Sequence, residues 1–311
     1  MSGPLYLVTG GAGFIGSHLA ERLIREDCRV RVLDDLSTGS AGNLEDLPVE
    51  LHQADLRDPQ AVAQLAEGAQ GIFHLGAIPS VTRSVENPRD THDANVTGTL
   101  NVLEAARRRS IKVVYAGSSS AYGDTPTLPK HEGMRESPQS PYAAAKLAGE
   151  LYVRSYARVY ELPTVTLRFF NVYGPRQRPD SPYSGVVARF ARAFLRNETP
   201  RIDGDGEQSR DFTFVEDTVD GVVRAMQQSV PPGSLYNVAT GVRVTVKELV
   251  WLLKELTGSR AEPEHGPPRP GDVRHSLADI ARAEAELGYR PRTALRDGLR
   301  KTVEWYVGTM A

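Results

Sequence analysis

The chain has 311 residues, of which 40% are hydrophobic and 24% are charged, and this balance provides for a large buried core. A formal net charge of −2 gives no field that would attract nucleic acid or an anionic membrane, so we expect neither as a partner. The single cysteine, Cys28, cannot form an internal disulfide, and no apolar stretch approaches the length of about 18 residues that crosses a bilayer. We therefore expect a cytoplasmic protein without a membrane span, and the scattered histidines predict no metal site.

The first predicted elements are a strand, a helix and a second strand, joined by a glycine-rich turn. The strand covers Leu5–Val8, the helix covers Phe14–Arg25 with apolar residues at helical spacing, and the second strand covers Arg29–Leu33. In the turn, Gly10, Gly13 and Gly16 lie three apart, which lets the backbone turn tightly and approach an anion closely. Since a helix N-terminus carries free N–H groups and a partial positive charge, this unit predicts a pyrophosphate site.

Asp34 ends the second predicted strand, 18 residues beyond Gly16. A carboxylate at this place accepts both hydrogen bonds of an adenosine ribose and repels a 2′-phosphate. We therefore expect NAD, rather than NADP, as the cofactor.

Strands and helices continue to alternate along the next part of the chain. Further strands are predicted at Val49–His52, Gly71–Leu75, Ile111–Ala116 and Thr164–Phe169, and helices at Pro59–Ala66, Pro88–Arg109 and Pro141–Tyr160. Each of these helices begins with proline, which fits the first turn of a helix because its missing N–H is not needed there. This alternation predicts an α/β fold with a Rossmann-type, doubly wound parallel sheet.

The sequence changes in character after about residue 172. A proline-rich stretch, YGPRQRPDSPY, is followed by predicted helices at Val186–Arg196, Val215–Gln228 and Thr245–Leu256, the last opened by a capping box of Thr245 and Glu248. The segment 262–271 is too rich in proline and glycine for a regular element. We expect residues 1–171 to form a dinucleotide-binding domain, and residues 172–311 to form mainly a smaller α/β substrate lobe that returns some segments to the sheet.

The candidate catalytic residues lie on the predicted helix Pro141–Tyr160 and on the turn before it. Tyr142 and Lys146 lie four apart, so both project from one face of the helix. A tyrosine is a poor base at neutral pH, but a nearby ammonium together with a positive nicotinamide stabilises its phenolate. Ser118, Ser119 and Ser120 follow a strand, at the edge of the sheet where doubly wound folds bind ligands. A hydroxyl there can bind a substrate hydroxyl and share the proton of the tyrosine.

Together these residues resemble the extended short-chain dehydrogenase/reductase superfamily, of NAD-dependent epimerases and dehydratases, and within it the UDP-sugar 4-epimerase branch. The motifs TGGAGFIGS, DDLSTG, HLGAIPSV, DANVTGTLNVLEAA, RFFNVYGPRQ, GDGEQSRDF and RPGD carry this likeness over nearly the whole chain. The resemblance implies that NAD contacts Gly10, Gly13, Phe14, Ile15, Asp34, Asp35, Ser37, Thr38, Gly39, Asp55, Leu56, Leu75, Gly76, Ala77, Asn95, Tyr142, Lys146 and Phe170.

The resemblance also implies that Tyr142 and Lys146 are the catalytic pair. The catalytic hydroxyl stays open between neighbouring serines. Counting back from Tyr122 selects Ser118, whereas anchoring on the triple serine favours Ser119 or Ser120.

A UDP-sugar is the substrate that the resemblance implies. The expected contacts are Asn171, Arg210 and Arg269 for the diphosphate, Phe212 and Asp272 for the uridine, and Ser80, Arg83, Ser120 and Ser276 for the sugar. Paired guanidinium groups suit a diphosphate because they give charge-assisted bonds to its oxygens. Ser276 stands where some relatives carry a bulky tyrosine that excludes N-acetyl groups, so we expect N-acetylated sugars to fit as well as unsubstituted hexoses.

The implied activity is NAD-dependent interconversion of UDP-hexose C4 epimers through a transient 4-keto sugar, in a homodimer. A UDP-sugar dehydratase or decarboxylase is one alternative, but such relatives commonly carry an acidic residue just after the catalytic hydroxyl, where this chain has Ser119 and Ser120. A non-catalytic NAD-binding sensor is the other alternative. It is disfavoured because the chain has both Tyr142 and Lys146.

Overall fold

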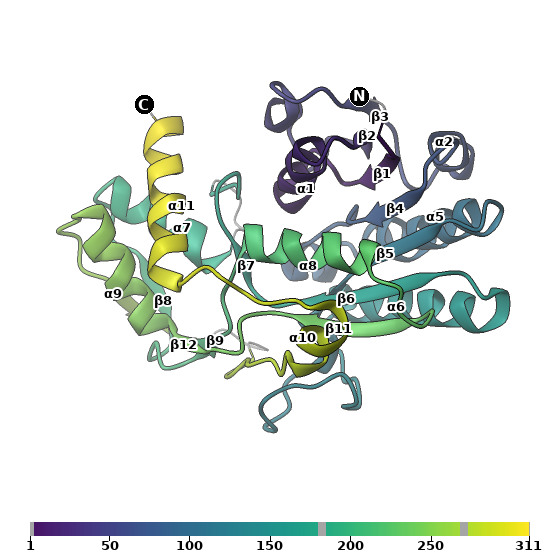
Figure 1. The fold of residues 1–311 in the computed structure, drawn as a ribbon. Helices are drawn as coiled ribbons and strands as arrows, with labels where there is room; N and C mark the ends of the chain where they lie inside the picture. Colours follow the sequence, from purple (N-terminus) through teal and green to yellow (C-terminus); the bar gives the residue numbers. More distant parts are fainter. Residues whose placement is uncertain (1–2, 180–184, 268–272, 311) are drawn as a thin grey trace.

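The computed structural model describes residues 3–179, 185–267 and 273–310. A seven-stranded sheet with the order β11-β6-β5-β4-β1-β2-β3 runs through it, and every neighbouring pair is parallel (Figure 1). Its strands are β1 (Leu5–Thr9), β2 (Arg29–Asp34), β3 (Glu50–Gln53), β4 (Gly71–His74), β5 (Lys112–Ser118), β6 (Thr164–Phe169) and β11 (Ser234–Val238). The predicted Rossmann-type sheet is therefore confirmed.

The strand order reverses between β1 and β4. From β1 the chain adds strands in one direction as far as β3, and from β4 it adds them in the other direction. In parallel sheets, ligands bind in the crevice at the carboxyl ends of the strands beside such a reversal. The segments after β1 and β4 therefore stand where a dinucleotide would bind.

Helices cover both faces of the sheet. On one face, α2 (Pro59–Leu65), α5 (Gly98–Arg107) and α6 (Pro141–Tyr160) share a core with Leu7 and Val113. On the other face, α1 (Phe14–Arg25) and α8 (Val215–Gln227) share a core with Val8 and Val114. Successive side chains of a strand point to opposite faces, and buried strands with apolar residues on both faces are typical of parallel sheets.

The remaining elements form a smaller group beyond the sheet, together with connecting helices. The group contains α7 (Val186–Leu195), α9 (Val246–Thr257) and α11 (Leu295–Met310), which contact one another (Figure 1). Short strands pair beside them: β7 (Val172–Tyr173) with β10 (Thr213–Phe214), β8 (Arg201–Asp203) with β13 (Glu264–Gly266), and β9 (Ser209–Arg210) with β12 (Val244–Thr245). The other helices are α3 (Val81–Glu86), α4 (Pro88–His92) and α10 (Ala281–Leu287).

Two predicted elements are wrong in part. The helix expected over Pro88–Arg109 is broken by a π-helical turn, η2 (Asp93–Thr97), between α4 and α5. The segment 262–271, expected to be irregular, contains β13, because Glu264 to Gly266 pair with the distant strand β8. Pairing between segments far apart in the chain leaves no local pattern.

Two properties of the described part of the chain concern membranes and metals. Each helix there is too short or too polar to cross a bilayer. In the same residues, His, Cys, Asp and Glu form no group that could hold a metal ion.

Candidate active site

The glycine-rich turn between β1 and α1 lies against the segment that follows β4. Gly10 has a φ of +70°, and a Cβ atom there would lie 2.7 Å from the Cα of Gly76. A Cβ at Gly16 would collide with the carbonyl oxygen of Gly10. The helix α1 begins after Gly13, and no side chain caps its N-terminus. This backbone cradle in front of a helix N-terminus fits the pyrophosphate of NAD.

Asp34 is held beside this cradle at the end of β2. One carboxylate oxygen accepts a hydrogen bond from the backbone N–H of Ala12 and the other from that of Leu36, each at 2.9 Å. Burial raises the pKa of this carboxyl group, and the two bonds act in the opposite direction. The Asp34 carboxylate therefore stands where dinucleotide-binding folds hold the adenosine ribose.

The neighbouring segments predicted to contact NAD gather around the same turn. A Cβ at Gly39 would lie 2.9 Å from the carbonyl carbon of Ala12, and one at Gly76 would lie 2.6 Å from Cδ1 of Leu56. Phe14 and Ile15 form the first turn of α1, whereas Leu75 and Ala77 flank Gly76. The structure thus brings the segments 10–16, 34–39, 55–56 and 75–77 together.

Three of the predicted cofactor residues are already engaged within the protein. Asp35 accepts hydrogen bonds from the backbone N–H of Ser37 at 2.9 Å and from its hydroxyl at 2.6 Å, in the loop that leads to Thr38. Asp55 forms an ion pair with Arg57 at 2.6 Å. The bonds of both carboxylates shape the loops that carry them.

Asn95 and Phe170 are buried. The Asn95 side chain accepts a hydrogen bond from the N–H of Ile78 at 2.7 Å and donates one to the carbonyl of Ile78 at 3.2 Å, so it holds the loop after β4. The Phe170 side chain is fully buried, and its ring centroid lies 6.2 Å from that of Tyr122. As the protein stands, this ring offers no surface to a nicotinamide, so a contact at this position would come from the backbone.

Tyr142 and Lys146 lie one turn apart near the start of α6. The helix begins at Pro141, where the Ser140 hydroxyl accepts the N–H of Ala143 at 3.1 Å. The half-buried phenol of Tyr142 is hydrogen-bonded to Ser118, the last residue of β5. The structure therefore brings Ser118 to Tyr142, whereas Ser120 reaches the pair indirectly, with its hydroxyl 2.8 Å from that of Ser118. Ser119 is partly buried in the same turn, and it forms no hydrogen bond with Tyr142.

We expect Lys146 and a positive nicotinamide together to lower the pKa of Tyr142, and the protein alone supplies only Lys146. Burial raises the pKa of Tyr142, and the hydrogen bond to Ser118 offsets only part of that effect. Burial also lowers the pKa of Lys146 to about 7, so this group is only partly charged at neutral pH. Further positive charge near the phenol is needed before Tyr142 becomes a base, and an oxidised nicotinamide is a source of such charge.

Sequence reasoning missed a buried chain of hydrogen bonds beneath the cofactor cradle. The ring nitrogens of His74 lie 2.7 Å from the Thr9 hydroxyl and 3.0 Å from the Thr99 hydroxyl. Thr9 also accepts the N–H of Gly76, and Thr99 donates to the carbonyl of Asn95. Burial lowers the pKa of His74 to about 3, so the ring is neutral. A polar residue at the end of a buried strand was the available signal.

Ser84 is a second residue that the sequence analysis missed. Its hydroxyl accepts the backbone N–H of Tyr142 at 3.0 Å and donates to the carbonyl of Val81. This bond joins α3 to the start of α6. Ser84 therefore connects the loop after β4 to the helix that carries the candidate catalytic pair.

The candidate sugar contacts on α3 take part in local structure. Ser80 caps α3 by accepting the N–H of Arg83 at 3.1 Å. The Arg83 guanidinium forms an ion pair with Asp90 at 2.9 Å, and Asp90 also pairs with Arg57. Arg83 is therefore held at Asp90, and would have to share or exchange that partner to bind a sugar.

The candidate nucleotide contacts lie on strands and loops of the smaller group. Arg210, on β9, donates hydrogen bonds to the carbonyl oxygens of Ser209 at 2.9 Å and of Arg274 at 3.2 Å. The buried Ser276 donates its backbone N–H to the same Ser209 carbonyl at 3.0 Å. Asn171, with a φ of +33°, lies two residues beyond the end of β6, whereas Phe212 is buried beside Tyr173. Arg210 and Ser276 are thus brought together, whereas Arg269 and Asp272 lie outside the described residues.

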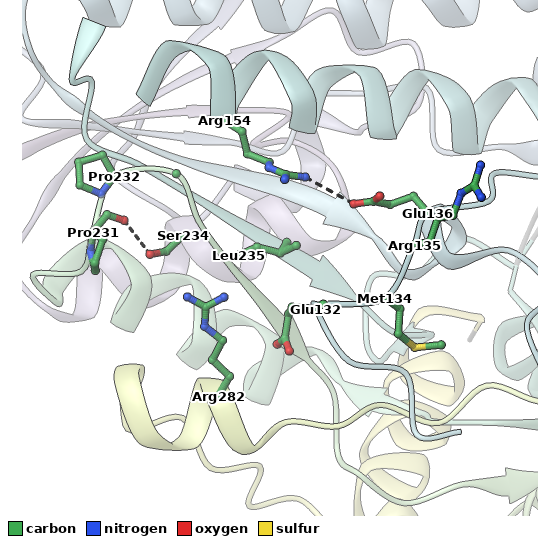
Figure 2. Close-up of a pocket in the computed structure, with 12 residues that line it drawn as sticks. Glu132, Met134, Arg135, Glu136, Arg154, Pro231, Pro232, Ser234, Leu235 and Arg282 are labelled. Atoms are coloured by element: carbon green, nitrogen blue, oxygen red, sulfur yellow. Dashed lines mark hydrogen bonds and ion pairs between the residues drawn. The ribbon is translucent and has the colours of Figure 1, made fainter. Parts of the chain in front are cut away.

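A separate cavity of about 570 Å³ lies near the edge strand β11 (Figure 2). It is lined by the segment 132–136, Arg154 of α6, the segment 231–235 and Arg282 of α10. Arg154 pairs there with Glu136 at 3.4 Å, and Ser234 donates to the carbonyl of Pro231. The cavity contains none of the predicted site residues, so it is distinct from the crevice at β1 and β4.

Comparison with known proteins shows which family the chain belongs to. The model of the NAD dependent epimerase/dehydratase family matches residues 6–239. A UDP-glucose 4-epimerase from Mycolicibacterium smegmatis is 44% identical over 307 residues, which are 96% of this chain and 97% of that protein.

Two solved structures also match nearly the whole chain. A UDP-glucose 4-epimerase from Thermotoga maritima, solved with UDP-glucose, has a TM-score of 0.95 at 38% identity and covers 99% of this chain and 100% of its own. A UDP-N-acetylglucosamine 4-epimerase from Methanobrevibacter ruminantium, in complex with UDP-N-acetylmuramic acid, has a TM-score of 0.95 at 36% identity and covers 100% of both chains. The chain therefore belongs to the NAD dependent epimerase/dehydratase family, as an NAD-dependent enzyme that is similar to UDP-glucose 4-epimerases.

Proposed function

We propose that this enzyme interconverts the C4 epimers of UDP-hexoses, both UDP-glucose with UDP-galactose and UDP-N-acetylglucosamine with UDP-N-acetylgalactosamine. The observation that carries the proposal is the placement of Ser118, Tyr142 and Lys146 at the carboxyl end of β5. This edge of the sheet also carries the glycine-rich cradle and Asp34. The similarity to 4-epimerases over nearly the whole chain supports it.

In this proposal Tyr142 moves the proton of the sugar 4-hydroxyl. Its phenolate oxygen accepts that proton while Ser118, already hydrogen-bonded to Tyr142, holds the same hydroxyl. A charged Lys146, one turn along α6, stabilises the phenolate. Gly10, Gly13, Asp34 and the loop held by Asn95 would bind NAD, which when bound accepts a hydride from C4 and can return it.

We propose that the nucleotide is held by the smaller group of elements. Arg210 on β9 and Asn171 after β6 would bind the diphosphate, with Arg269 as a second guanidinium. Phe212 and Asp272 would contact the uridine, and the small side chain of Ser276 would leave room for an N-acetyl group. A sugar held only through its nucleotide can rotate and present either face of C4, as inversion requires.

Elimination is the competing chemistry within the family, which includes dehydratases. Dehydratases and decarboxylases of this kind commonly carry an acidic residue just after the catalytic hydroxyl, where a proton must be moved at C5 or C6. In this chain Ser119 and Ser120 follow Ser118, and Ser120 is hydrogen-bonded to Ser118. A hydroxyl is not a base at neutral pH, so these neighbours favour epimerisation.

The proposed substrate range is tested by NMR of a panel of UDP-hexoses, UDP-N-acetylhexosamines and UDP-uronic acids. We expect both unsubstituted and N-acetylated hexoses to give a mixture of C4 epimers with the wild-type enzyme. Ser276→Tyr should lose activity selectively on the N-acetylated substrates, because the added ring fills their space. Equal loss on both classes would contradict the role proposed for Ser276.

We also propose that the enzyme is a homodimer. Val85 on α3 and Leu151 and Tyr152 on α6 are exposed apolar side chains, on helices that contact each other. A pair of such helices from each subunit would cover these side chains. Light scattering coupled to size-exclusion chromatography should give about twice the 34.0 kDa mass of one chain, and a Leu151→Glu variant should give the monomer mass.

A further inference from the structure

Lys146 is a buried ammonium group that lacks a nearby anion. Its side chain is only 5% exposed. Within residues 3–179, 185–267 and 273–310, no carboxylate lies at ion-pair distance from its Nζ atom; Glu150, one turn further along α6, is bound to Arg168 at 2.7 Å. A buried charge without compensation is costly, so any group that stabilises the ammonium raises the fraction of Lys146 that is charged.

The group that contacts this ammonium is the aromatic face of Tyr115. Nζ of Lys146 lies 4.6 Å from the centroid of the Tyr115 ring. At such a distance the negative face of the ring attracts a cation, and the attraction is stronger where water is excluded. Tyr115 is itself 1% exposed, in the middle of β5.

The other end of Tyr115 fixes the backbone of the same residue. The Tyr115 hydroxyl donates a hydrogen bond to the carbonyl oxygen of Lys146 at 3.0 Å. Gly149 makes this possible, because a Cβ atom there would collide with that hydroxyl. Tyr115 therefore acts on Lys146 twice, through its ring on the ammonium and through its hydroxyl on the helix.

We propose that Tyr115 is a positioning residue, whose ring holds Lys146 as an ammonium beside Tyr142. The proposal rests on the proposed function, in which a charged Lys146 stabilises the phenolate of Tyr142. His74, whose ring centroid lies 5.6 Å from that of Tyr115, is neutral because burial lowers its pKa to about 3. Tyr142 is neutral in the resting protein, and Glu150 is neutralised by Arg168. Among the described residues, the ring of Tyr115 is thus the group that offsets the effect of burial on the charge of Lys146.

The test is a direct titration of Lys146 by ¹³C NMR of its Cε atom in the full-length protein as purified, with its retained cofactor. The Lys146→Arg variant assigns the signal. Tyr115→Leu, which removes the ring, should lower the pKa of Lys146 by about one unit. Tyr115→Phe removes only the hydroxyl, so it should leave this pKa within a few tenths of a unit of the wild-type value.

The direction of the shift separates the proposal from a packing effect. Water that entered the space left by Tyr115→Leu would raise the pKa of Lys146, whereas loss of the ring attraction lowers it. Tyr289→Leu is the control, since Tyr289 is equally buried and bonds to the Ala239 carbonyl away from Lys146. A pKa that is unchanged or raised in Tyr115→Leu, or lowered equally by Tyr115→Phe, would overturn the proposal.

Activity provides the second measurement. In Tyr115→Leu we expect kcat to fall about tenfold with little change in KM, and the alkaline limb of the pH profile to move to lower pH. If Tyr115→Leu does not fold by circular dichroism, Tyr115→Met replaces it, because methionine fills similar space without a π face. The NMR titration needs no turnover of a UDP-sugar, so failure of the proposed function leaves this test intact.

Discussion

Tyr142 and Ser118 are joined by a hydrogen bond at the end of β5, and the proposed proton transfer depends on this pair. Tyr142→Phe removes the group that takes the proton of the 4-hydroxyl, so we expect kcat to fall about 10²- to 10⁴-fold. Ser118→Ala removes one hydrogen bond to a charged transition state, for which we expect a loss of about 10- to 100-fold. Steady-state assays of epimer formation measure both losses in kcat.

Ser119→Ala serves as the matched control for Ser118→Ala. Ser119 forms no hydrogen bond with Tyr142, so loss of its hydroxyl should change kcat less than about threefold. A larger loss in Ser119→Ala than in Ser118→Ala would assign the catalytic hydroxyl to Ser119 and contradict this geometry.

Lys146 also makes stability depend on pH. Burial lowers its pKa in the folded chain to about 7, below the ordinary value of 10.5 in the unfolded chain, so between these values the unfolded chain binds more protons. The cost of burying Lys146 is therefore fully present below pH 7 and shrinks as the pH rises. Lys146→Met removes this cost, so its stability advantage over wild type should shrink by about 2 kcal/mol between pH 7.5 and 9.5.

Urea unfolding of the cofactor-free proteins at the two pH values measures this difference. Lys301→Met is the control, because it removes a lysine from an exposed position on α11. An advantage of Lys146→Met that stays constant or grows with pH would show that Lys146 has an ordinary pKa in the folded state.

At the scale of elements, an ion pair anchors α6 to the sheet. Arg168 of β6 bonds the Glu150 carboxylate of α6 through two nitrogens, at 2.7 and 2.9 Å, and both side chains are buried. Arg168→Met leaves the buried Glu150 without its two short bonds and with only the half-exposed Arg154 at 3.7 Å, which should cost about 3 to 5 kcal/mol of unfolding free energy in urea. Arg300→Met, which removes the exposed partner of Asp297, should cost less than about 1 kcal/mol. Equal costs for the two variants would contradict an anchoring role for Arg168.

The close packing of the turn between β1 and α1 predicts that a side chain at Gly10 weakens NAD binding. Gly10→Ala places a Cβ 2.7 Å from Gly76 on a backbone with a φ of +70°, so the cradle must open. We expect NAD binding, measured by calorimetry on protein freed of cofactor, to weaken at least about tenfold. Gly42→Ala is the control, because its Cβ would meet only the Ser40 hydroxyl at 3.5 Å. Unchanged affinity in Gly10→Ala would place the cofactor elsewhere.

Elements with local signals could be predicted from the sequence closely. The helix α6 is predicted with its observed bounds, because Ser140, Pro141 and the apolar spacing all act within the helix itself. The capping box of Thr245 and Glu248 at α9 is likewise confirmed. The strands β8 and β13 were missed, because each has three residues and forms only when the other lies beside it.

In the candidate site, too, features with a local sequence signal could be predicted, and features that depend on distant contacts could not. The sequence predicts the glycine cradle and the Tyr142–Lys146 spacing, since both are patterns in a short stretch of chain. It could not predict that Arg83 pairs with Asp90, nor that Tyr115 lies under Lys146. It also could not predict how strongly burial, which depends on the whole fold, acts on the pKa of Tyr142 in the protein alone.

For the whole molecule, the proposed reaction needs two parts with different roles. The sheet carries the cofactor cradle, Tyr142 and Ser118, whereas the elements beyond it carry Arg210 and Ser276. The strand β11, from the second half of the chain, pairs with β6. The second half of the chain therefore contributes a strand to the same sheet that carries the cofactor cradle. A UDP-sugar bound through its nucleotide could rotate its sugar ring between the sheet and the smaller group of elements.

The most direct measurement of this account follows the hydrogen at C4. UDP-galactose labelled with deuterium at C4 is incubated with the wild-type enzyme, and the products are analysed by NMR and mass spectrometry. The account predicts UDP-glucose that retains the deuterium at C4, because the hydrogen that leaves this carbon returns to it. Deuterium transferred to C6, lost to solvent, or found in a product that has lost water or carbon dioxide would contradict it.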